Sequence, residues 1–181
     1  MSARLHAFLF PGPTGQLEGL WKGAENGHAG SAVFAHPHPV YGGTLHSKVV
    51  FRAARTLSRA GYGVLRFNFR GVGLSEGRYD EGRGETADYR AALDEAERRG
   101  GQPIVAGGFS FGSAVGLKAI EGDPRVVAFI GVGVPLASDV GADLPFPKVP
   151  ALFVVGKDDV FGPPARLREW AAGRGLVVEV A

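Results

Sequence analysis

Ser110 is the residue of this chain best placed for nucleophilic chemistry. It lies in Gly108-Phe109-Ser110-Phe111-Gly112, which matches the pattern G-x-S-x-G between an apolar run typical of a strand and a segment typical of a helix. A sharp turn at such a junction raises the serine side chain above the sheet, and the glycines let the backbone bend. The alternative is a glycine-rich turn with an incidental serine. The strand–helix context favours a nucleophile, and the amide of Phe111 at the helix start can stabilise an oxyanion.

Two adjacent carboxylates could support that serine. A serine nucleophile needs a base, and the base needs an acid that orients it. The segment Gly156-Lys157-Asp158-Asp159 directly follows the predicted strand 151–155, so either aspartate side chain could lie at the carboxyl edge of the sheet, where catalytic groups gather. The alternative is an Asx turn before a helix that starts near Pro163.

The segment His36-Pro-His-Pro-Val-Tyr-Gly-Gly43 follows the predicted strand 31–35. A loop in this position supplies the second oxyanion amide in α/β folds with such a serine. Proline has no N–H, so the donor must be His38, Val40, Tyr41 or a glycine. The His-x-His spacing also suggests a metal pair, but no further histidine or carboxylate cluster supports it, and we expect no metal. A third interpretation is a rigid loop whose imidazoles bond to the backbone.

A second glycine pattern, Gly71-Val-Gly73, follows the predicted strand 64–69. Glycines after a strand are typical of dinucleotide-binding loops. Here the third glycine of that motif is misplaced and no helix starts at once. A turn that shapes the same cleft is the favoured interpretation.

The elements that position these residues alternate between strand and helix. Strands are predicted at 31–35, 64–69, 104–106, 126–132, 151–155 and 176–180, and helices at about 44–60, 85–99, 111–120 and from 163 or 164 onward. Short apolar strands that alternate with amphipathic helices indicate parallel βαβ units with helices on both faces of the sheet. Residues 7–10 and 16–22 predict a hairpin, which adds antiparallel edge strands at the N-terminus.

Composition bounds the class of protein. The chain has 181 residues, of which 45% are hydrophobic and 21% charged, so we expect one globular domain over 1–181. The absence of cysteine excludes disulfides, cysteine-ligated zinc, iron–sulfur clusters and a thiol nucleophile. The net charge is +2 and the basic residues are scattered, so we expect no nucleic-acid partner. No apolar stretch is long enough for a membrane span, and we expect a soluble cytoplasmic protein with a small-molecule substrate.

The motifs HPHPVYGG, RFNFRGVGLSEG, GFSFG and GKDD, in this order and spacing, resemble the small α/β-hydrolases similar to dienelactone hydrolase. The resemblance covers roughly residues 5 to 181, and the first two motifs are specific to a bacterial subgroup of predicted hydrolases. It implies the α/β-hydrolase fold without a large cap domain and without a cofactor. It further implies Ser110 as nucleophile, Asp159 as the acid, and Phe111 with the His38–Tyr41 loop as oxyanion hole. The implied reaction is hydrolysis of a carboxylester, thioester or lactone through an acyl-enzyme.

The chain departs from that family at the catalytic histidine, which in the family follows the last strand and precedes a final helix. All five histidines (His6, His28, His36, His38 and His46) precede Ser110. We expect the base and the closing helix to lie in a tail beyond Ala181, since the last strand otherwise lacks a covering helix. The alternative is a degenerate member that binds a ligand in the same cleft. A nucleotide-binding protein that uses Gly71 and Gly73 is less favoured.

Overall fold

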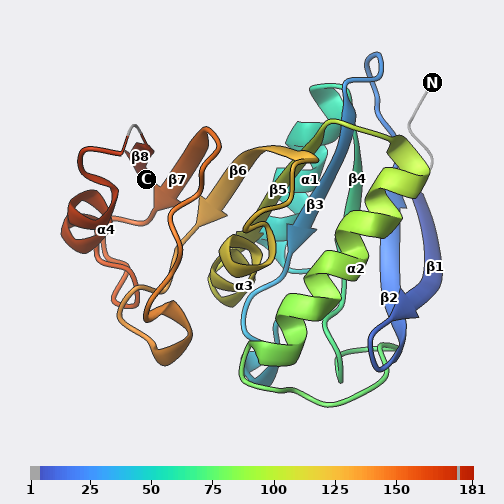
Figure 1. The fold of residues 1–181 in the computed structure, drawn as a ribbon, viewed down its shortest axis with the longest axis horizontal. Helices are drawn as coiled ribbons and strands as arrows, with labels where there is room; N and C mark the ends of the chain where they lie inside the picture. Colours follow the sequence, from blue (N-terminus) through green and yellow to red (C-terminus); the bar gives the residue numbers. More distant parts are fainter. Residues whose placement is uncertain (1–4, 175) are drawn as a thin grey trace.

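The computed structural model describes residues 5–174 and 176–181. They form one eight-stranded sheet in the order β1-β2-β4-β3-β5-β6-β7-β8 (Figure 1). Strands β3 to β8 are parallel, whereas the hairpin β1–β2 joins β4 antiparallel. The strands are β1 (Leu5–Gly12), β2 (Gly15–Lys22), β3 (Gly30–Ala35), β4 (Tyr62–Phe67), β5 (Ile104–Phe109), β6 (Val126–Val132), β7 (Ala151–Val155) and β8 (Val177–Val180). The predicted mostly parallel sheet with an antiparallel N-terminal edge is confirmed.

Within residues 5–174 and 176–181, four α-helices cover the sheet from both sides. They are α1 (Lys48–Arg59), α2 (Arg83–Gly100), α3 (Phe111–Ala119) and α4 (Pro164–Ala171), and two short 3-10 turns are η1 (Pro39–Tyr41) and η2 (Asp139–Gly141). Helices α2, α3 and α4 contribute to one apolar cluster, and α1 packs on the opposite face. Among the described residues, no helix is long and apolar enough to cross a membrane.

Helix α1 starts four residues later than the sequence predicts. The sequence predicts a helix from about residue 44, but residues 44–47 form a turn closed by the Ser47 N–H, which donates to the Thr44 carbonyl at 2.9 Å. In that turn the Ser47 hydroxyl accepts the Thr44 N–H at 3.3 Å, and the Thr44 hydroxyl accepts the His46 N–H at 3.2 Å. Threonine and serine compete in this way with the helical ladder for backbone groups, so the helix begins only at Lys48.

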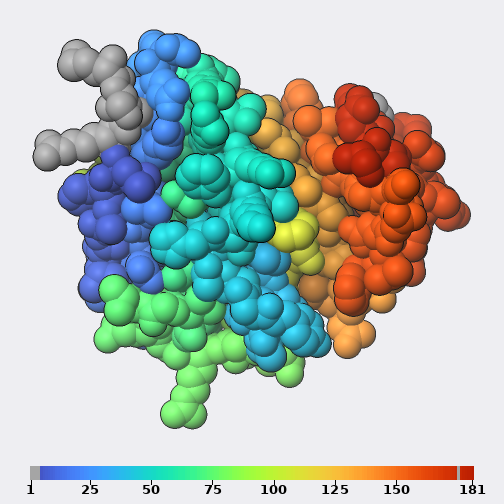
Figure 2. Space-filling model, turned by 180° about the vertical axis from the view of Figure 1, so that it is seen from behind, coloured from blue at the N-terminus to red at the C-terminus, as the bar shows by residue number. Residues whose placement is uncertain are grey.

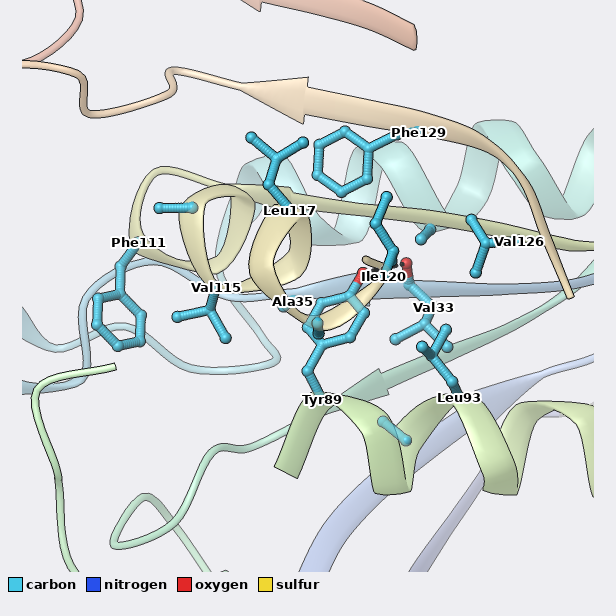
Figure 3. Packing of buried hydrophobic residues seen from close by; sticks show 14 of the residues in the cluster. Val33, Ala35, Tyr89, Leu93, Phe111, Val115, Leu117, Ile120, Val126 and Phe129 are labelled. Atoms are coloured by element: carbon cyan, nitrogen blue, oxygen red, sulfur yellow. Dashed lines mark hydrogen bonds between the residues drawn. The ribbon is translucent and has the colours of Figure 1, made fainter. Parts of the chain in front are cut away.

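The core beneath the site is tied together by Tyr89 of α2 (Figure 3). Its side chain is fully buried, and its hydroxyl donates to the Gly107 carbonyl at 2.8 Å and accepts the Gly107 N–H at 2.9 Å. Burial raises the pKa of this phenol. Phe111 and Val115 of α3 pack in the same cluster. The end of β5 is therefore held from below by α2 and α3.

The face of the sheet that carries α1 is only partly covered (Figure 2). Helix α1 contacts β3, β4 and β5, whereas Ile130 of β6 and Leu152 of β7 lie half-buried on the same face. Val177 of β8 pairs next to Leu152 and is 51% exposed. Beside α1, this face offers apolar side chains that no described helix covers.

Candidate active site

Ser110 occupies a strained turn between β5 and α3. Its φ of 52° and ψ of −119° lie in a region that residues with a Cβ rarely adopt, at a cost of about 1–3 kcal/mol. The flanking glycines are needed by contact: a Cβ on Gly108 would collide with the backbone of Gly112, and one on Gly112 with the backbone at Ala35 and His36. The Ser110 N–H donates to the Val132 carbonyl at 2.8 Å. Such over-determined strain favours a functional serine over an incidental one.

The half-buried Ser110 lines an open cleft of about 680 Å³ at the carboxyl edge of the strands. Aromatic and aliphatic side chains form most of the cleft lining, and charged and polar side chains form the rest. Its lining comprises His38, Val40, Tyr41, Tyr79, Phe111, Pro135, Val140 and Phe161, with Glu81, Arg83, Lys118, Ser138 and Asp139 as the polar part. Arg83 is paired with Glu81 at 2.9 Å, so these two charges of the cleft lining offset each other.

Two main-chain amides are free to stabilise an oxyanion beside Ser110. Within the described ranges, the N–H groups of Phe111 and His38 have no acceptor. Phe111 is the first residue of α3, where the helix dipole adds positive potential. The Tyr41 N–H, a candidate donor from the sequence, donates in this structure to the His38 carbonyl at 3.2 Å. The Val40 N–H is likewise engaged, so His38 is the remaining candidate of this loop.

Both histidines of the His-x-His segment have engaged rings. His36 is fully buried; its Nδ1 bonds to the Pro37 carbonyl at 2.6 Å, and its Nε2 accepts the Phe69 N–H at 3.1 Å. Burial lowers the pKa of His36 to about 4. His38 bonds through Nδ1 to Val40 and through Nε2 to Tyr79. Neither ring has a nitrogen to spare for a metal, and the described residues hold no cluster of three potential metal ligands.

Asp159 is anchored on one oxygen and open on the other. Its Oδ1 accepts the N–H groups of Phe161 at 2.9 Å and Gly162 at 3.0 Å, which is the Asx turn considered above. Its Oδ2 lies beside Gly133, 3.2 Å from where a Cβ on that residue would stand. Asp158 is exposed and bonds to none of the described residues. The geometry thus holds Asp159, and not Asp158, in a fixed orientation.

The end of β6 separates Ser110 from Asp159. The Val132 carbonyl holds the Ser110 amide, and the next residue, Gly133, touches the Asp159 carboxylate. Ser110 follows β5 and Asp159 follows β7, so two strand spacings, roughly 10 Å, lie between them. That distance excludes a direct hydrogen bond and leaves room for an intervening imidazole. His38 is the histidine among the described residues that lines the cleft, and its two ring nitrogens bond to Val40 and Tyr79 instead of to Ser110 or Asp159.

The Gly71–Gly73 segment is a structural turn. No helix starts after it until Arg83. Gly73 lies against Glu18 and Asn68, which hydrogen-bond to each other at 2.7 Å. Side chains therefore occupy the space that a dinucleotide phosphate would need, and the nucleotide-binding alternative has no support in this loop.

Tyr79 is a cleft residue that the sequence analysis missed. Its hydroxyl lies 3.0 Å from Nε2 of His38, and its ring packs 5.9 Å from that of Phe111. It belongs to the irregular segment between β4 and α2 and lies two residues beyond the motif RFNFRGVGLSEG, in a stretch without periodicity. Only the tertiary structure brings it to the cleft.

Comparison with known proteins places the chain among serine hydrolases. A family model described as serine aminopeptidase, S33, matches residues 38–140, more than half of the chain. An α/β serine hydrolase homologue from Coxiella burnetii is 35% identical, with a TM-score of 0.88, over 100% of this chain and 88% of that one. A serine hydrolase without a lid from Xanthomonas campestris is 30% identical, with a TM-score of 0.87, over 99% and 84%.

Two further comparisons bear on the fold and on length. A dienelactone hydrolase from Anabaena variabilis shares the fold at 19% identity and a TM-score of 0.78, covering 100% of this chain and 87% of that one. An uncharacterised protein of Rickettsia prowazekii is 36% identical over 155 residues, which are 83% of this chain and 65% of that protein. The chain thus spans just under two thirds of the length of that curated relative.

Proposed function

This chain belongs to the serine hydrolases of the α/β-hydrolase superfamily, and on that premise we propose that it hydrolyses an ester-like bond through a covalent acyl-enzyme. The observation that carries the proposal is the backbone at Ser110. A serine at φ 52°, flanked by glycines that no larger residue could replace without collision, is held there at an energetic cost. A requirement that the Ser110 hydroxyl face a substrate accounts for this conformational cost.

In the proposed reaction, the Ser110 Oγ attacks the carbonyl carbon and gives its proton to a base. The carbonyl oxygen becomes an oxyanion, which accepts from the amides of Phe111 and His38. Collapse of this intermediate expels the alcohol, thiol or ring oxygen, which takes up the proton. Water then attacks the acyl-enzyme by the same route and releases the acid. No cofactor takes part in these steps.

Asp159 is proposed as the acid that orients the base. Its Oδ1 is fixed by two backbone amides, which leaves Oδ2 to accept a proton from an imidazole above Gly133. A buried or hydrogen-bonded carboxylate of this kind holds the tautomer of the histidine and stabilises the imidazolium.

The cleft favours an uncharged substrate with an apolar group. Most of its lining is aromatic or aliphatic, and of these side chains Val40, Tyr41 and Phe161 are 61% exposed or more. Apolar walls of this kind bind by the area they bury. We therefore expect esters of uncharged acids or alcohols to be better substrates than dicarboxylates.

A fluorophosphonate probe tests the proposal. The wild-type full-length protein should become labelled at Ser110 and hydrolyse p-nitrophenyl esters, and Ser110→Ala should lose both. The Ser113→Ala variant is a matched control, because Ser113 lies one turn away with its hydroxyl bonded to the Ser110 carbonyl at 2.6 Å. Labelling that persists in Ser110→Ala would overturn the proposal. A wild type that binds esters without labelling or turnover would indicate the degenerate ligand-binding alternative.

A further inference from the structure

The side chains of the two proposed oxyanion donors pack against each other. The imidazole of His38 lies 5.0 Å from the ring of Phe111, and it also packs 4.7 Å from Tyr41 and 5.1 Å from Tyr79. Phe111 is fully buried beneath this cluster. The spacing between the two amides is therefore linked to how these rings pack, as well as to the backbone.

Hydrogen bonds select one tautomer of the His38 ring. Nδ1 accepts the N–H of Val40 at 3.3 Å, so the proton of the neutral ring belongs on Nε2. Nε2 lies 3.0 Å from the Tyr79 oxygen, to which it then donates. The phenol oxygen accepts this bond, and its own proton stays available on the cleft side.

The same residue holds the turn η1 from both ends. The His38 carbonyl accepts the N–H groups of Tyr41 at 3.2 Å and Gly43 at 3.0 Å, while its ring accepts that of Val40. Gly43 packs so closely on the backbone of Pro37 and His38 that a Cβ there would collide. The His38 N–H shares its peptide plane with the Pro37 carbonyl, which bonds to Nδ1 of His36 at 2.6 Å. The engaged carbonyl and ring of His38 hold the other side of the same Cα, so the free N–H has one orientation.

We propose that the His38 side chain is a positioning residue for the oxyanion site: its imidazole, held by Tyr79, fixes η1 through Val40 and thereby aims the main-chain N–H of His38. The inference rests on the proposed function, because it assigns a task within the same site. A donor displaced by about 1 Å can lose about 10²-fold in rate, so a side chain that fixes a donor has a measurable effect without touching substrate.

The test separates the side chain of residue 38 from its amide, which every variant retains. His38→Leu removes the acceptor for Val40, whereas His38→Asn places an amide oxygen near the position of Nδ1. We expect kcat to fall about 10²-fold in His38→Leu with KM little changed, and to recover largely in His38→Asn. Tyr79→Phe should lower kcat in the same direction by less. His46→Leu is the matched control, since that imidazole is exposed on the following turn.

Hydrogen exchange at the Val40 amide provides a readout independent of activity. The amide should be protected in wild type and His38→Asn, and should exchange faster in His38→Leu. Unchanged kcat in His38→Leu, with Ser110→Ala inactive, would overturn the positioning role and leave the hydrolase proposal intact. Equal exchange rates of the Val40 amide in all variants would show that the His38 ring does not fix η1, even in a protein without ester turnover. Loss of kcat in His38→Asn equal to that in His38→Leu also contradicts it.

Discussion

Ser110 shows how one residue's geometry carries chemical meaning. Glycines account for most of the positive φ angles among the described residues, yet Ser110 keeps φ 52° with a side chain. The strand before it, the helix after it and two obligatory glycines leave no other path for the backbone. Asp159 is the complementary case, because backbone amides fix one carboxylate oxygen and free the other.

Asp159 should matter far more than Asp158 for turnover. We expect Asp159→Asn to lower kcat/KM by up to about 10⁴-fold, the loss known for such an acid in a serine protease. Asp158→Asn should stay near wild type, because that side chain is exposed and bonds to none of the described residues. Steady-state kinetics of the two full-length variants makes the comparison. If Asp158→Asn is the impaired variant, the assignment of the acid is wrong.

At the scale of elements, α2 joins the site to the core. Its Asp88 binds Arg70 through two hydrogen bonds of 2.9 and 2.7 Å, and both side chains are buried. The next residue, Tyr89, bonds to both polar groups of Gly107 in β5. One turn of α2 thus fixes the segment after β4 and the strand that leads to Ser110.

Removing the Tyr89 hydroxyl should destabilise the fold. Tyr89→Phe leaves the buried N–H of Gly107 without this acceptor, which costs about 1–3 kcal/mol in the free energy of unfolding. Tyr62→Phe is the control, because the Tyr62 hydroxyl makes no bond to the described residues and its ring is only half-buried. Urea unfolding of both variants measures the difference. A Tyr89→Phe variant as stable as Tyr62→Phe would show that the buried hydrogen bonds contribute nothing net.

At the scale of the whole molecule, buried groups and uncovered surface set stability and association. His36 connects the loop after β3 to Phe69 beyond β4, deep in the fold. On the α1 side, by contrast, β6, β7 and β8 extend beyond the helix and leave apolar side chains half-exposed. The first feature predicts a pH dependence, and the second a tendency to self-associate.

Acid should weaken the fold through His36. Burial lowers the pKa of His36 from 6.5 to about 4. Between these pH values the unfolded state therefore binds a proton at this residue and the folded state does not. The contribution of neutral His36 to the free energy of unfolding is fully present above pH 6.5. It is lost as the pH falls toward 4, by about 3 kcal/mol in total. His36→Gln should be less stable at neutral pH but show a shallower loss between pH 6.5 and 4 in urea unfolding. Parallel pH curves for the two proteins would contradict this origin.

Self-association of the 181-residue chain should run through the uncovered face. Val177→Lys places a charge on the uncovered face at β8 and should lower the association seen by light scattering at high concentration, because a charge disfavours burial of an apolar surface against another copy. Leu5→Lys is the control on the opposite edge strand β1, where Leu5 is 55% exposed. An equal effect of both substitutions would indicate general charge repulsion instead.

Local patterns in the sequence determine the elements and the turn that carries the proposed nucleophile. Apolar runs and glycine positions predict the order of strands and helices, and G-x-S-x-G at a strand–helix junction predicts the turn at Ser110, because both depend on neighbours within a few residues. The start of α1 is an exception, since serine and threonine hydroxyls redirect the backbone bonds of residues 44–47.

Tertiary structure decides the parts of the site that depend on distant partners. The sequence leaves open which amide of the His38–Tyr41 loop is free, and hydrogen bonds to the His38 carbonyl and ring answer it. From the sequence alone, the choice of Asp159 over Asp158 depends on the family resemblance. In the structure, two backbone amides fix the Asp159 carboxylate beside Gly133. Tyr79 has no sequence signal at all. Which amide is free, how a carboxylate is oriented and what surrounds a phenol depend on groups that are far apart along the chain. Only tertiary packing brings these groups together.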